Sequence, residues 1–145
     1  DAAAAVLVVG ESLLSRLDLG GRRPLRLVHG VSRGSDPENP PLAPIAATRA
    51  LLADTGVAAS TLAVAEVMEA FAVQAMVCIR EIGLPGARVN VGGGALARGH
   101  PIGASGAINV VRLWRELQAL AAPASGVATI AAAGGLGSAV LLRGD

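Results

Sequence analysis

The sequence predicts an α/β fold with a layered, mostly buried sheet. Short, continuously apolar runs typical of buried strands alternate with longer runs that have helical spacing. Clusters of glycine and proline separate these runs and indicate turns. The 145 residues are 52% hydrophobic and 16% charged, which is typical of a globular chain with a core of its own. Alternation of strands and helices in one such chain favours layered packing around a sheet.

The first part of the chain is predicted to form two strands and two helices. A continuous apolar run ended by Gly10 indicates a buried strand, and alternation after Pro24 indicates a second one. Several prolines then indicate a loop, and Gly56 is placed to end a helix. In chain order we expect a strand at 4–9, a helical turn at 11–17, a strand at 24–30, a loop at 32–44 and a helix at 45–55.

The second part continues the alternation and ends in a hairpin. Gly83 is placed to end a helix, and Ser60 is placed to cap a brief turn. The last two strands are joined by the glycine-rich residues 133–137, which predict a tight connection. We expect strands at 63–67 and 88–91, helices at 69–82 and 102–120, and the hairpin strands at 126–132 and 138–143.

The stretch 90–107 is the strongest candidate for function. It places six glycines around His100 and Pro101, directly before the predicted long helix. Glycine allows backbone to turn tightly and approach a ligand, and proline suits the first turn of a helix. A histidine there could donate an N–H to a carbonyl or an oxyanion. The alternative is a histidine that only caps the loop.

Two further stretches are weaker candidates. Residues 66–74 include Met68 and Phe71 and lie where a strand passes into a helix, a common place for ligand groups in α/β proteins. Their alternative is ordinary core packing, with Glu69 as a helix N-terminal charge. Residues 128–139 form the glycine-rich hairpin, which could aim backbone N–H groups at an anion or be a plain turn.

Composition excludes some partners. The net charge is +1, so nothing favours nucleic acid or an anionic membrane. No apolar run is long enough to span a membrane, and the opening residues lack a basic signal-peptide segment. The single cysteine, Cys78, cannot form an internal disulfide and is expected to be a buried small hydrophobe; a reducing, cytoplasmic location is expected. Because the sequence opens abruptly on an apolar strand pattern, we expect a fragment or half of a split protein.

Residues 93–107, Gly-Gly-x-x-Ala-x-Gly-His-Pro-Ile-Gly-Ala-Ser-Gly-Ala, resemble the C-terminal Gly-His-Pro motif of the thiolase family. Residues 1–7 resemble the family strand that closes the N-terminal domain, and 44–51 resemble a family helix start. The resemblance implies a layered αβα unit with a mixed sheet. It divides the chain into 1–20, the tail end of an N-terminal domain, and 21–145, a C-terminal thiolase-like domain.

The resemblance also implies a reaction and a site. Family members transfer acyl groups between coenzyme A thioesters, and His100 fits the histidine that activates a cysteine nucleophile, here expected in an N-terminal half outside the chain. The family's second cysteine falls at Ala131, and its water-holding asparagine falls at Met68. Alanine has no ionisable group, and methionine is only a weak acceptor. The remaining oxyanion and substrate positions carried over are Phe71, Ala133, Gly134 and Gly135.

Two functions therefore stay open. One is a thiolase-like acyl-CoA acyltransferase of lipid metabolism, acting by acyl transfer or C–C bond chemistry. The other is a catalytically impaired thiolase-like subunit that binds acyl-CoA or scaffolds a partner; a purely structural domain is a third, weaker interpretation. The resemblance implies acyl-CoA as substrate, no cofactor and no metal. It also implies an N-terminal half on the same or another chain and a homo- or hetero-oligomer.

Overall fold

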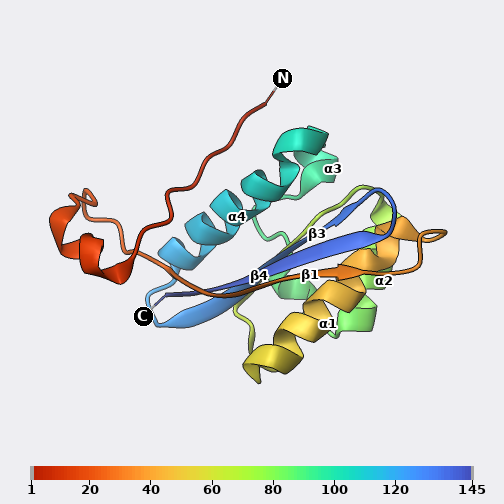
Figure 1. Cartoon of the computed structure of the whole chain (residues 1–145), viewed down its shortest axis with the longest axis horizontal. Helices are drawn as coiled ribbons and strands as arrows, with labels where there is room; N and C mark the ends of the chain where they lie inside the picture. Colours follow the sequence, from red (N-terminus) through yellow and green to blue (C-terminus); the bar gives the residue numbers. More distant parts are fainter. Residues whose placement is uncertain (1, 145) are drawn as a thin grey trace.

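The computed structural model describes residues 2–144 (Figure 1). Its α-helices and strands follow the alternation expected from the sequence. The helices are α1 (Ala43–Thr55), α2 (Ala72–Ile82), α3 (Ala95–Arg98) and α4 (Ile102–Ala119), and the strands are β1 (Arg26–Gly34), β2 (Val64–Val67), β3 (Ala124–Ala132) and β4 (Leu136–Gly144). Short 3-10 helices lie at Glu11–Arg16, Pro40–Leu42, Ala59–Thr61 and Gly86–Arg88.

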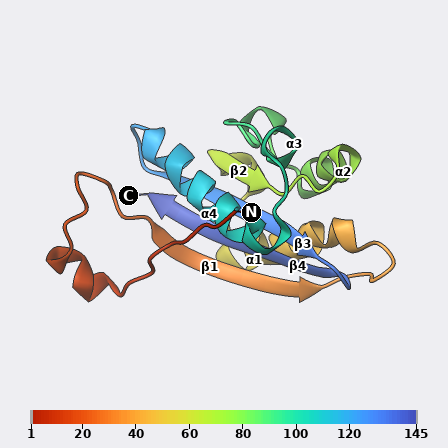
Figure 2. The ribbon, with the colours of Figure 1, turned by 90° about the horizontal axis from the view of Figure 1, so that it is seen from above.

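The strands form one mixed sheet in the order β1-β4-β3-β2. Strand β4 is antiparallel to both β1 and β3, whereas β2 and β3 run parallel. Helix α4 covers one face of the sheet, and α1 and α2 lie on the other (Figures 1 and 2). The result is three layers, helix on sheet on helix, as the sequence predicts.

Burial on both sides explains why the central strands are continuously apolar. In β3, Val127 packs into the core shared with α1 and α2, and the next residue, Ala128, packs beneath α4. Leu141 and Leu142 of β4 divide between the same two cores. Since successive strand residues point to opposite faces, a strand covered twice needs apolar residues at every position.

The prediction of a buried strand at 4–9 is wrong. These residues form no strand, and Val6, Leu7 and Val8 are 50%, 80% and 70% exposed. Residues 2–4 lie near the start of α4, the segment then leads away from that helix (Figure 2), and no strand pairs with it. An apolar run indicates a strand only where a neighbour satisfies its backbone groups. Asp1, at the start of the predicted segment 1–20, lies outside the described residues, and the division at residue 20 stays a prediction.

Other element bounds shift by a few residues. Strand β1 continues through Gly34, into the predicted loop, and residues 88–91 contribute only one bridge, Ala65 to Val89. Helix α2 starts at Ala72 rather than 69, and Ser60 makes no capping hydrogen bond. Gly56 and Gly83 end α1 and α2 in the left-handed conformation, as expected. Within residues 2–144, no helix has the length and apolar character that crossing a membrane requires.

Candidate functional site

His100 lies on the exposed loop between α3 and α4. Its Nδ1 atom is 2.7 Å from Oγ of Ser105, whose hydroxyl donates to the Pro101 carbonyl oxygen at 2.9 Å. When the serine proton lies on that carbonyl, the tautomer that completes the hydrogen bond to His100 is the one with its proton on Nδ1. Nε2 of the neutral ring is then the free lone pair, which is what a general base needs.

A cavity of about 160 Å³ lies beside this loop. Gly99 and Pro101, the two neighbours of His100, line it together with Met68. Its other walls are Ala2, Ala95, Arg98, Ser105, Ile108 and Asn109. The structure thus brings two of the sequence-predicted stretches, the histidine loop and the segment after β2, to the same hollow.

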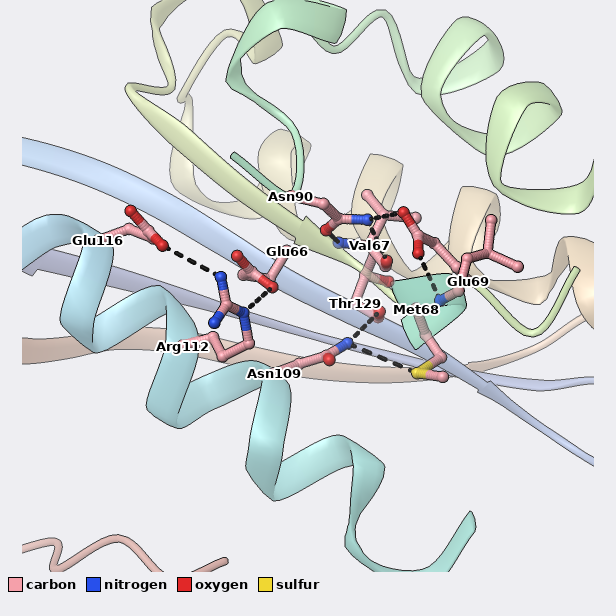
Figure 3. A network of polar contacts seen from close by, with 10 residues as sticks. Glu66, Val67, Met68, Glu69, Asn90, Asn109, Arg112, Glu116 and Thr129 are labelled. Carbon is pink, nitrogen blue, oxygen red and sulfur yellow. Dashed lines mark hydrogen bonds and ion pairs between the residues drawn. The ribbon is translucent and has the colours of Figure 1, made fainter. Parts of the chain in front are cut away.

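Helix α4 holds the histidine loop and the segment after β2 together through a stripe of buried residues at every fourth position. The stripe consists of Ser105, Asn109, Leu113 and Leu117. Asn109 donates from Nδ2 to the Thr129 carbonyl oxygen at 3.4 Å, and the Met68 N–H donates to the same oxygen at 3.0 Å (Figure 3). The carboxyl ends of the parallel strands β2 and β3 therefore lie beneath the first turns of α4, where α/β proteins usually bind ligands.

The glycine loop before His100 is shaped by Glu69 and Asn90. Glu69 accepts hydrogen bonds from Asn90 Nδ2 at 2.6 Å and from the backbone N–H of Leu96, in the first turn of α3, at 2.9 Å (Figure 3). Asn90 also bonds both backbone groups of Val67. A Cβ atom at Gly94 would lie 2.0 Å from the Glu69 carboxylate, so any side chain there would displace that carboxylate. Glu69 thus contacts the start of α3 rather than that of α2.

A second polar group lies under the same loop. Glu66, which is 1% exposed, accepts from Arg112 Nε at 3.3 Å, and Arg112 also contacts Glu116 at 3.1 Å (Figure 3). The Glu66 Oε1 atom is buried without a hydrogen-bond partner. Burial raises the pKa of Glu66 to about 7, and the Arg112 guanidinium opposes that rise.

The remaining predicted site residues lie outside this cavity's wall. Phe71 is 65% exposed, which excludes the core-packing alternative for it, whereas Met68 is 3% exposed. Ala131 is part-buried in β3, two residues beyond Thr129. Of the turn residues, Ala133 and Gly134 are exposed, and Gly135 lies against the loop after β1, where the Ser35 N–H donates to the Gly135 carbonyl oxygen at 2.7 Å. The ligand roles of these residues stay predictions.

Cys78 is buried in α2, as the sequence predicts. Its Sγ accepts from Gln74 Nε2 at 3.3 Å, and burial raises the pKa of the thiol. A thiolate, rather than a thiol, is the nucleophilic form of cysteine. Cys78 is therefore unsuited to covalent catalysis, and the chain has no other cysteine.

Ser105 and Asn109 are site residues that sequence reasoning missed. The signal was present, because both share the four-residue spacing of Leu113 and Leu117 on what is otherwise an apolar helix face. A polar residue on such a face needs a partner or a ligand. Glu66 and Arg112 were also missed, and their separation by 46 residues left no local signal.

The fold and the site together define a three-layer α/β domain with a histidine directly before α4, the helix that covers one face of the sheet. The family model for the thiolase C-terminal domain matches residues 24–144. An acetyl-CoA acetyltransferase of Thiocystis violacea is 44% identical over 144 residues, which are 99% of this chain and 36% of the relative. The chain belongs to the thiolase family and corresponds to its C-terminal domain.

Solved structures agree in fold. The chain superposes on the Acat5 thiolase of Ascaris suum, solved in complex with coenzyme A, with a TM-score of 0.82, 36% identity and coverage of 94% of this chain and 34% of that one. The yeast peroxisomal 3-ketoacyl-CoA thiolase gives a TM-score of 0.78 and 33% identity over 83% of this chain and 34% of that one. That thiolase is a five-layered structure of two core domains with identical topology, and it is dimeric. The chain spans only 33% to 39% of the curated relatives' length.

Proposed function

We propose that the complete gene product that carries this chain transfers acyl groups between thioesters of coenzyme A. The observation that carries the proposal is the bond between His100 Nδ1 and Ser105 Oγ, which leaves Nε2 as a free base on an exposed loop. His100 accepts the thiol proton of a cysteine outside residues 1–145, and the resulting thiolate attacks the acyl thioester. The family membership and the coenzyme A bound by the Ascaris thiolase support this substrate class.

The part played by this chain is narrower than that of a complete thiolase site. Ala131 supplies no ionisable group, so a base for removing an α-proton has to come from elsewhere if C–C bonds are made or cleaved. Acyl transfer to and from the cysteine needs no such base. We further propose that the gene product is an oligomer, as the dimeric yeast thiolase is.

The test is acyl labelling of the complete gene product. Incubation with acetyl-CoA is expected to add about 42 Da to one cysteine other than Cys78, the mass of an acetyl group. The substitution His100→Ala should slow labelling by about 10²- to 10⁴-fold because the base is lost. The matched control is His29→Ala, since His29 lies in β1 and pairs with Asp54 at 3.3 Å, away from the cavity.

A non-catalytic thiolase-like subunit that binds acyl-CoA or scaffolds a partner is the second candidate. Ala131 and Met68 favour it, because neither side chain moves a proton or binds a water strongly. Absence of any label with acyl-CoA, together with retained acyl-CoA binding, would establish this second function. Equal labelling of the native protein and the His100→Ala variant would remove His100 from the mechanism.

A further inference from the structure

The side-chain amide of Asn109 makes only long, weak hydrogen bonds within the part of the chain that the structure describes. A primary amide offers two N–H donors and a carbonyl acceptor. Asn109 makes two long contacts from Nδ2, to the Thr129 carbonyl oxygen at 3.4 Å and to the Met68 sulfur at 4.0 Å. Sulfur is a weak acceptor, and 3.4 Å exceeds the usual N–H···O range. A buried amide with such weak partners is expected to bind something else.

What it faces is the cavity beside His100. Asn109 is 7% exposed and lines this cavity of about 160 Å³ together with Ser105. Ser105 lies one helical turn before Asn109 on the same buried stripe, and Ser105 is the residue that orients the His100 ring. The Asn109 amide therefore lines the hollow one helical turn beyond the serine that contacts the imidazole, and the two chain neighbours of His100 line the same hollow. A water molecule occupies about 30 Å³ in the liquid, so a cavity of about 160 Å³ has room for ordered water.

We propose that Asn109 holds a water in this cavity that donates a hydrogen bond to the carbonyl oxygen of the acyl thioester. This inference rests on the proposed function. Asn109 is a positioning residue, because it acts on the substrate through the water. Met68 cannot take this role, since a thioether does not donate a hydrogen bond. Its sulfur, 4.0 Å from Asn109 Nδ2, shows that position 68 reaches the same wall of the cavity.

The test uses Asn109→Leu in the complete gene product, because leucine is similar in shape and has no polar atoms. Loss of a positioned donor to a developing oxyanion lowers kcat by about 100-fold or more, so that loss is expected with KM changed less than about three-fold. The matched control is Gln118→Leu, which removes an amide from the same helix. Gln118 bonds the backbone of Arg23 and does not line the cavity.

A second variant separates this role from simple packing. Adding Met68→Asn to Asn109→Leu returns an amide to the cavity from the neighbouring position 68 and should recover at least about ten-fold in kcat. The inference is overturned if Asn109→Leu keeps the native kcat, or if its loss of kcat is no greater than that of Gln118→Leu. Either outcome leaves the proposed acyl transfer intact. A loss of kcat that parallels a fall in melting temperature and is not recovered in the double variant also overturns the inference. A native protein without acyl transfer overturns the proposed function and this inference together.

Discussion

Two glycine-rich segments predicted to bind ligands have different neighbours in the structure. In the loop at 90–107, a Cβ atom at Gly92 would lie 2.2 Å from the Arg112 guanidinium, and one at Gly94 would lie 2.0 Å from the Glu69 carboxylate. In the hairpin at 133–137, a Cβ atom at Gly137 would lie 2.2 Å from the Ala43 carbonyl oxygen. The first segment is shaped by charged side chains, and the second is held against backbone.

The difference separates two uses of glycine that the sequence does not distinguish. Side chains can shift to accommodate an added methyl group, whereas backbone of a packed helix start cannot shift without moving the helix. Gly137 therefore fixes the approach of β4 to α1. The loop glycines instead allow buried charges to lie close beneath the backbone that leads to His100.

The largest effect is expected for Gly137→Ala. The new methyl group would overlap the Ala43 carbonyl group at the start of α1, which costs about 3 kcal/mol of unfolding free energy. The matched control in the same hairpin is Gly134→Ala, where nothing lies within 4 Å of the new atom and only the φ of +81° is unfavourable, at about 1 kcal/mol. Urea unfolding of the complete gene product measures both. Equal destabilisation by the two variants would show that backbone contact does not distinguish the hairpin.

The second prediction concerns the charges beneath the loop. The pKa of Glu66 is raised from 4.5 to about 7, so the folded state holds its proton more tightly than the unfolded state does. The associated stability is complete below about pH 4.5 and is lost as the pH rises through about 7. Glutamine has no proton to lose, so the Glu66→Gln variant does not acquire the buried charge. Its unfolding free energy, relative to that of the native protein, should therefore rise by about 2 kcal/mol from pH 5 to pH 8.

Unfolding curves at both pH values measure this gain. The control is Glu116→Gln, which removes Arg112's other carboxylate partner from a side chain that is 24% exposed. Its difference from the native protein should change much less between the two pH values. Parallel pH dependence of the native protein and Glu66→Gln would mean that burial of Glu66 does not govern the pH response beneath the loop.

Local signals predicted most of the fold, and long-range contacts account for what they missed. Gly56, Gly83 and Pro101 set helix ends through backbone geometry that each residue carries with it, so those bounds were predictable. The apolar run at 4–9 failed as a strand because pairing depends on distant neighbours. The contact between Arg112 and Glu66 joins α4 to β2, and no spacing rule gives it. The Asn109 position was available from helical periodicity alone.

The smallest effect on stability is expected for Gly94→Ala, in the loop itself. The Glu69 carboxylate would have to move away from the new methyl group and release the Leu96 N–H, which costs about 1 kcal/mol. That hydrogen bond holds the first turn of α3, and the loop that carries His100 follows α3 directly. The rate of acyl transfer should therefore fall further than the small loss of folded protein would explain. The matched control is Gly103→Ala in α4, where nothing lies within 4 Å and alanine favours the helix by about 1 kcal/mol. If both variants keep native activity, the charged side chains beneath the loop do not position His100, and the two glycine-rich segments serve packing alike.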